Sequence, residues 1–173
     1  MEGLAAWGYP LFTRVEPGTP KPDLAELIEA CLASGNPRFE GAVIALLLLS
    51  SSAESRGGVS PLAARLSGKM ARSLRWLTLA ADYLAQIYGL DVRVLLGRDA
   101  HPPVDLFNRG ALPPRELDDG EAGLRALAEE LCREEDAWLN WAGSFEDPVR
   151  KLVKHHWIRK GAELARARHA GAG

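Results

Sequence analysis

The densest run of hydrophobic positions lies at residues 42–49, where every residue is apolar. Asn36 and Pro37 precede it with helix-start chemistry, because asparagine caps a first turn and proline suits the first helical position. Glu40 follows in the first turn, where the helix dipole favours a negative charge. A helix that is apolar on all sides must be buried on all sides. We therefore predict a central helix over residues 37–49, with other helices packed around it.

Amphipathic helices are predicted on either side of the central one. Residues 22–34 place apolar side chains at i, i+3, i+4, i+7 and i+8, which is the spacing of one helical face. Gly35 is placed to end that helix, and the short junction after it predicts a hairpin of the first two helices. Residues 69–88 follow heptad spacing and carry a second apolar side that includes Trp76 and Tyr83. We expect this helix to contact two neighbours, or one neighbour and a partner chain.

Two further amphipathic helices are predicted toward the C-terminus, over residues 117–142 and 147–168. The second would begin at Asp147 and Pro148, a cap followed by a proline at the first helical position. Its apolar stripe consists of Val149, Leu152, Val153, Trp157 and Leu164. Ile158 lies on the other, polar side of this helix, which is unusual for a face exposed to water.

Three stretches are predicted to be irregular. Prolines, glycines and aromatic residues in residues 1–21 indicate an extended arm, in which Trp7 and Phe12 would anchor to the bundle or reach a partner subunit. Small polar residues and a glycine pair indicate a plain linker over residues 50–60. Residues 90–116 are predicted to be a long loop that starts as either a short strand or a helical turn.

The 3.6-residue periodicity extends over most of the chain, and no run of strands competes with it. The predicted fold class is therefore all-α: a single bundle of about five helices around a buried central helix. The irregular arm would cover residues 1–21 and the bundle residues 22–169. A length of 173 residues and an apolar content of 47% suit one domain with a sizeable core.

The start of the chain, its apolar runs and its cysteines indicate the compartment of the protein. The chain does not begin with a basic stretch and a long apolar run, and the central apolar run is shorter than the roughly 20 residues that span a bilayer. We expect a cytoplasmic protein with no membrane segment. Cys31 and Cys132 have no second cysteine or histidine at metal-ligand spacing, so we expect two buried thiols, no metal and no cofactor. A disulfide between the two cysteines is the alternative.

Charge is distributed unevenly along the chain. The net charge is −2, so a nucleic-acid role would need a local basic patch. Segment 116–136 has nine acids against two bases, and segment 148–173 has seven bases against one acid. These charges either pair or face solvent, or the basic helix binds a protein partner or nucleic acid. The basic residues that would bind are Arg65, Lys69, Arg72, Lys151, Lys154, Arg159 and Arg166.

One motif in the basic helix points to catalysis. Arg150 and His155 have R-x4-H spacing, and Arg150 and His156 have R-x5-H spacing. The motif resembles that of the HEPN family of helical ribonucleases. The resemblance implies an all-helical fold and metal-independent RNA cleavage, in which Arg and His from paired protomers hold and cleave a phosphodiester. Because His156 also falls near the apolar stripe, a packing role is the alternative for it.

The sequence thus leads to three hypotheses of function. The first is a non-enzymatic interaction protein, either a homo-oligomer or a subunit of a small complex. Its interfaces would use Trp7, Phe12, Trp76 and Tyr83. The second is the HEPN-like protein that cleaves or binds RNA. The third is a bundle that holds an apolar ligand between Trp76, Trp138 and Trp141.

Overall fold

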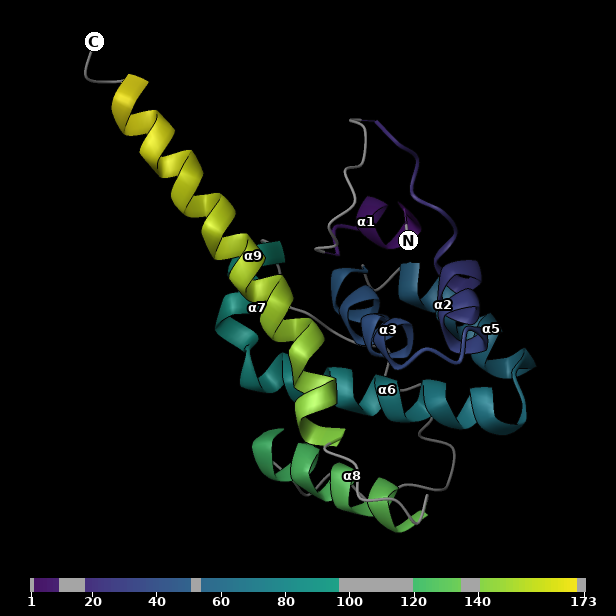
Figure 1. Ribbon diagram of the computed structural model, residues 1–173. Helices are drawn as coiled ribbons and strands as arrows, with labels where there is room; N and C mark the ends of the chain where they lie inside the picture. Colours follow the sequence, from purple (N-terminus) through teal and green to yellow (C-terminus); the bar gives the residue numbers. More distant parts are fainter. Residues whose placement is uncertain (1, 10–17, 51–53, 97–119, 135–140, 171–173) are drawn as a thin grey trace.

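The computed structural model describes residues 2–9, 18–50, 54–96, 120–134 and 141–170. These residues form helices, with no strand within the described ranges, and this confirms the all-α prediction. In chain order the elements are α1 (Glu2–Ala6), α2 (Leu24–Ala33), α3 (Pro37–Leu49), the π-helix η1 (Ser55–Val59), α5 (Ser60–Arg65), α6 (Gly68–Ile87), α7 (Gly89–Leu96), α8 (Gly120–Glu134) and α9 (Trp141–Ala170) (Figure 1).

The α3 helix is the centre of the fold and has the predicted bounds. Residues 42–48 are all buried. The side chain of Asn36 accepts a hydrogen bond of 3.0 Å from the backbone N–H of Arg38, so the expected cap is formed. Packing against α2, α6 and α9 covers α3 from several sides, which is what an apolar run without a polar face requires.

The predicted hairpin of α2 and α3 is also present. The Asp23 carboxylate caps α2 by accepting a 3.0 Å hydrogen bond from the backbone N–H of Glu26. Gly35 has a φ angle of +62°, in the left-handed region that glycine adopts at little cost. The chain therefore reverses within a few residues, and α2 packs against α3.

Both apolar sides of α6 are covered by the chain itself. One side packs on α3 and another on α8, and Figure 1 shows α6 between these two helices. The approach to α8 is close, because a Cβ added to Gly123 would lie 2.2 Å from Cε1 of Tyr83. A Cβ added to Gly120 would lie 2.8 Å from the backbone oxygen of Tyr83. Small residues in α8 thus let the two helices meet.

The prediction of an irregular arm is wrong for its first residues, because residues 2–6 form the helix α1. Leu4, Trp7 and Tyr9 are buried in the same hydrophobic core as α3. The indole N–H of Trp7 donates a 3.0 Å hydrogen bond to the backbone oxygen of Pro22. Burial of these three side chains stabilises a helix that is too short to be stable by itself.

The prediction of a plain linker at residues 50–60 is wrong as well, since η1 and the start of α5 lie there. Val59 and Leu62 are buried, so this segment contributes to the core. Gly58 lies against α2, where an added Cβ would be 3.6 Å from the backbone nitrogen of Ala25. A glycine pair that looks flexible in sequence is here part of a packed helical turn.

The last helices also differ from their predicted bounds. Gly89 begins α7 directly after α6. Of the two predictions for the start of residues 90–116, a short strand or a helical turn, the helical one is therefore confirmed. Residues 97–119 lie outside the described ranges. Asp147 and Pro148 do not begin the last helix, because Pro148 lies inside α9. Phe145, one turn earlier, is buried in the core. We attribute the continuation of α9 across Pro148 to this burial, which offsets the cost of a proline within a helix.

Candidate interaction surface

The α9 helix has an inner half that belongs to the bundle and an outer half that leaves it. The inner half buries Phe145, Val149 and Leu152 and packs against α3, α6, α7 and α8. Residues 157–163 are all exposed. Figure 1 shows this end of α9 extending away from the other helices (yellow-green to yellow). We refer to residues 157–170 as the outer half.

Two residues of the outer half point away from the side of α9 that packs on the bundle. Ile158 follows Val149 by nine residues, and Gly161 follows Leu152 by nine. At 3.6 residues per turn, nine residues make two and a half turns. Ile158 and Gly161 therefore lie on the side of α9 opposite to the residues that contact the bundle. The described part of the bundle leaves this outward side of α9 exposed.

Three large hydrophobic side chains are exposed where α9 leaves α7. Within the described residues, Trp157 is 48% exposed, Ile158 63% and Val94 47%. The indole N–H of Trp157 donates a 3.1 Å hydrogen bond to the carboxylate of Asp91 on α7. This bond fixes one edge of the indole and leaves much of the ring in contact with water.

Small residues continue the same side of α9 beyond Ile158. A Cβ added to Gly161 would meet nothing within 4 Å, and Ala162 and Ala165 are exposed. Trp157, Ile158, Gly161, Ala162 and Ala165 lie within about 140° of the helix circumference at roughly 100° per residue. We refer to these five residues as the outer face.

Cationic residues border the outer face. At about 100° per residue, Lys160 lies beyond Trp157 on one edge and Arg166 beyond Ala162 on the other. Lys154 lies in line with the face, one turn before Ile158. All three cations are exposed. The one acid of this region, Glu163, lies on the back of the helix and pairs with Arg159 at 3.4 Å.

A polar contact fixes the start of α9 to the end of α6. The Tyr88 hydroxyl donates a hydrogen bond to Glu146, whose carboxylate also pairs with Arg150 at 2.7 Å. The hydrogen bonds from Tyr88 and then Arg150 hold the pKa of Glu146 below its usual value. Burial, followed by the bond to Glu146, raises the pKa of Tyr88. This contact helps to set the direction in which the outer half leaves the bundle.

We expect the contribution of Glu146 to stability to be lost in acid. Because its pKa is lowered by folding, the contribution is present above the ordinary carboxyl pKa of 4.5 and disappears as pH falls through the folded value. Glu146→Gln should therefore lower the urea midpoint at pH 7, and its difference from the unsubstituted protein should shrink as pH falls through the folded pKa of Glu146. Asp147→Asn is the control, since Asp147 forms an exposed ion pair with Lys151 of the same helix, and its loss should have a much smaller effect at pH 7. Equal effects of the two substitutions would contradict a role for the Tyr88 contact.

The residues of the R-x4-H and R-x5-H motifs do not converge within one chain. Arg150 is paired with Glu146, and His155 lies five residues further on, about 140° away around the helix. His156 is partly buried, and its Nε2 has no hydrogen-bond partner among the described residues. Its ring packs edge-on against Trp157, with 5.7 Å between ring centroids. A reaction centre would need a second protomer, so the catalytic role of these residues stays a prediction.

The other predicted cations do not form one continuous basic groove. Arg65 pairs with Glu29 of α2, and Lys151 pairs with Asp147 of its own helix. Lys69 and Arg72 are exposed near the start of α6. Figure 1 shows that end of α6 beside α5, away from the point where α9 crosses. The two basic rows that the sequence suggested as walls of one groove are therefore separated.

The aromatic residues predicted at interfaces are used mainly inside the chain. Trp7 and Trp76 are buried, and Tyr83 packs over Gly123 of α8. Phe12 lies outside the described residues. For the predicted apolar-ligand site, Trp76 is a core residue, while Trp138 and the side chain of Trp141 lie outside the described part of the chain.

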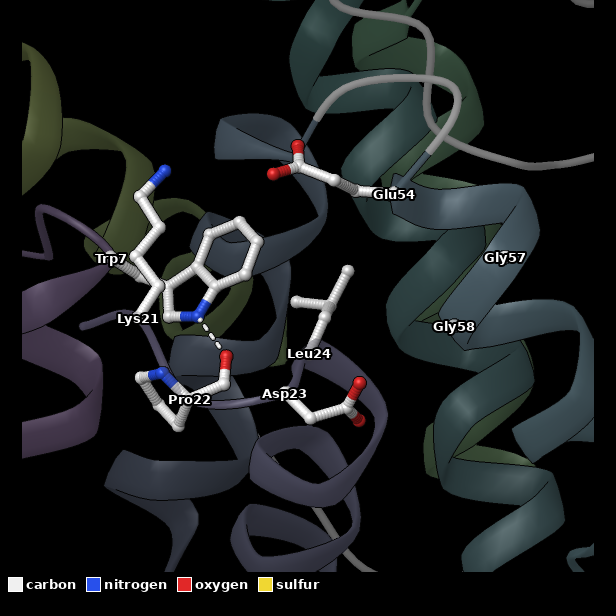
Figure 2. Close-up of a pocket in the computed structure, with 8 residues that line it drawn as sticks. All are labelled: Trp7, Lys21, Pro22, Asp23, Leu24, Glu54, Gly57 and Gly58. Atoms are coloured by element: carbon white, nitrogen blue, oxygen red, sulfur yellow. Dashed lines mark hydrogen bonds between the residues drawn. The ribbon is translucent and has the colours of Figure 1, made fainter.

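A shallow cleft of about 360 Å³ lies between α1, the start of α2 and η1 (Figure 2). Its polar groups already bind one another. The indole N–H of Trp7 donates to Pro22, and the Lys21 ammonium lies 4.5 Å from the centre of the Trp7 ring. Asp23 is the cap of α2. These intramolecular contacts account for the Trp7, Lys21 and Asp23 side chains of the cleft without a ligand.

The chemistry of Cys31 is that of a packing residue. Cys31 is buried and forms no disulfide. Burial raises the pKa of its thiol to about 11, so the reactive thiolate is scarce at neutral pH. The side chain of Cys132 is not among those described. Within the described ranges, no group of three or more His, Cys, Asp or Glu residues could hold a metal ion.

Neither a membrane segment nor a known relative helps to assign the function. No helix in the described part of the chain is both long enough and apolar enough to cross a bilayer. Comparisons with protein-family models, curated proteins and solved structures find no match for this chain.

Sequence reasoning placed Trp157 in the stripe that faces the bundle, and the outer face was missed. The signal was present in the unusual position of Ile158 on the polar side. Gly161, Ala162 and Ala165 surround that position on a helical wheel. Read together, these four residues describe a second apolar side that begins where the first one ends.

Proposed function

We propose that this protein is a non-enzymatic interaction protein that binds another protein chain through the outer half of α9. The observation that supports this most is the outer face itself, on which Ile158 is 63% exposed on the side opposite to the bundle. Burial of a side chain such as isoleucine is worth roughly 1.5–3 kcal/mol, and the bundle does not provide it. A binding partner that packs on the outer face would bury this side chain.

The exposure of the outer half supports the same proposal. Most helical stability in proteins comes from tertiary packing, which the exposed residues 157–163 of α9 largely lack. The Trp157–Asp91 hydrogen bond joins the base of the outer half to α7. A partner that packs on the outer face would stabilise both the helix and the apolar residues on it.

The proposal predicts that Ile158 lies at a protein interface in the cell. A photo-crosslinking amino acid in place of Ile158 should give a discrete protein adduct in the cells that make this protein. The same amino acid at Ala126, which is exposed on α8, is the matched control and should give none.

The adduct must also depend on the outer face. Gly161→Gln, which adds a long neutral side chain at the centre of the face, should abolish it. Glu163→Gln, on the back of the same helix, should leave it unchanged. If position 158 gives no more adduct than position 126, the proposed function is wrong. The mass of the adduct distinguishes a second copy of the chain from another protein.

A further inference from the structure

The dimensions of the outer face match those of one helix. At a rise of 1.5 Å per residue, the distance from Trp157 to Ala165 is about 12 Å, or a little more than two turns. Gly161 lies in the middle of the face and is open to solvent. Small residues at such a contact let two helix axes approach to about 8 Å, the lower end of the usual range.

The side chains at the two ends of the outer face differ in size, so the face is bulky at one end and shallow at the other. Trp157 and Ile158 form a bulky end near α7, and Gly161, Ala162 and Ala165 form a shallow strip beyond it. Side chains of a facing helix can fill that strip and pack against the bulky end, as ridges pack into grooves. A helix with its own apolar stripe therefore fits this face.

The charges on the borders determine what that facing helix should carry. Arg166 lies about 40° beyond one edge of the face and Lys160 about 60° beyond the other, positions from which long side chains can pair with a facing helix. Lys154 lies in line with the face, at the end nearest the bundle. Because all three cations are exposed, acidic side chains at the matching positions of a partner helix would pair with them.

The same charges argue against two other occupants. A second copy of the outer half would bring four bases and one acid against an identical set, and like charges at an interface are unfavourable. A nucleic acid matches this surface less well, because Trp157 and Ile158 lie exposed between Lys160 and Arg166. The neighbouring cation Arg159, about 20° from Arg166 around the helix, is paired with Glu163.

We propose that the partner of the outer face is an acidic amphipathic helix of a different protein, whose apolar stripe is bordered by aspartate or glutamate. This inference rests on the proposed function and adds the chemistry of the partner to it. Recognition would combine burial of Trp157 and Ile158 with ion pairs to Lys154, Lys160 and Arg166.

Two synthetic helical peptides test the inference with the full chain. Both have the same leucine stripe, and their border positions are either all glutamate or all glutamine. Fluorescence anisotropy at low salt should show the glutamate peptide binding at least about ten-fold more tightly than the glutamine peptide. That preference should shrink as salt is added, because exposed ion pairs are screened.

Variants of the chain assign the binding to the outer face. Ile158→Asp should remove binding of both peptides, and Lys160→Glu with Arg166→Glu should remove the preference for the glutamate peptide. Lys69→Ala, at the distant basic row, should change neither. Circular dichroism checks that each variant keeps its helical content.

Three results would overturn the inference. The first is equal binding, or no binding, of the two peptides. The second is self-association in light scattering that Ile158→Asp abolishes, which would identify a second copy as the occupant and leave the proposed function intact. The third is tight, salt-dependent binding of a single-stranded RNA oligonucleotide that competes with the peptide. The absence of any crosslinked protein at position 158 refutes the proposed function itself, so the two failures are distinguishable.

Discussion

Replacing Leu46 with alanine is expected to lower the free energy of unfolding by about 2–5 kcal/mol. Leu46 is completely buried at the centre of α3, and its neighbours on all sides are apolar. The substitution removes buried methyl groups and leaves a cavity that the surrounding helices can close only in part. Urea unfolding followed by circular dichroism measures the loss.

Val94→Ala is the matched control for this prediction. It also shortens a branched hydrophobic side chain, but Val94 is 47% exposed on α7. Its effect should stay within about 0.5 kcal/mol. A loss for Leu46→Ala as small as the loss for Val94→Ala would mean that α3 is not surrounded by the other helices.

Replacing Gly123 with alanine is expected to cost about 1–3 kcal/mol, although alanine is the better helix former. The added Cβ would lie 2.2 Å from Cε1 of Tyr83 and 2.6 Å from its Cζ, far inside van der Waals contact. Either the Tyr83 ring or the α8 helix must move. Urea unfolding again measures the change, and a stabilised protein would contradict the close α6–α8 contact.

Two further variants separate this clash from other effects of glycine. Gly161→Ala, where the added Cβ meets nothing within 4 Å, should be neutral or stabilising by up to about 1 kcal/mol. In a double-mutant cycle, Tyr83→Ala should relieve part of the cost of Gly123→Ala. Additive effects of the two substitutions would show that Tyr83 is not the group that Gly123 accommodates.

The elements whose signals are local were predictable from the sequence. Asn36, Pro37 and the apolar run define α3, because a cap, a first-turn proline and a lack of polar positions act within the helix itself. Gly35 similarly determines the α2–α3 hairpin, since few residues other than glycine adopt its φ angle of +62° without strain. For these segments, local preference and burial favour the same structure.

The elements that the sequence did not predict are those that tertiary contacts impose. Residues 2–6 are helical because Leu4, Trp7 and Tyr9 are buried in the common core. The α9 helix continues across Pro148, and the burial of Phe145 explains this. In each case the free energy of burying apolar side chains outweighs the local preference of proline or glycine.

The outer half of α9 also depends partly on local sequence and partly on tertiary packing. The sequence by itself determined that α9 is basic and that Ile158 lies off its first apolar stripe. Only the tertiary structure decided which side of α9 meets the bundle, where the bundle ends, and hence that Ile158 and Gly161 face away from it. Periodicity specifies how residues are arranged around a helix axis, but the neighbours of that axis depend on packing between segments far apart in the chain.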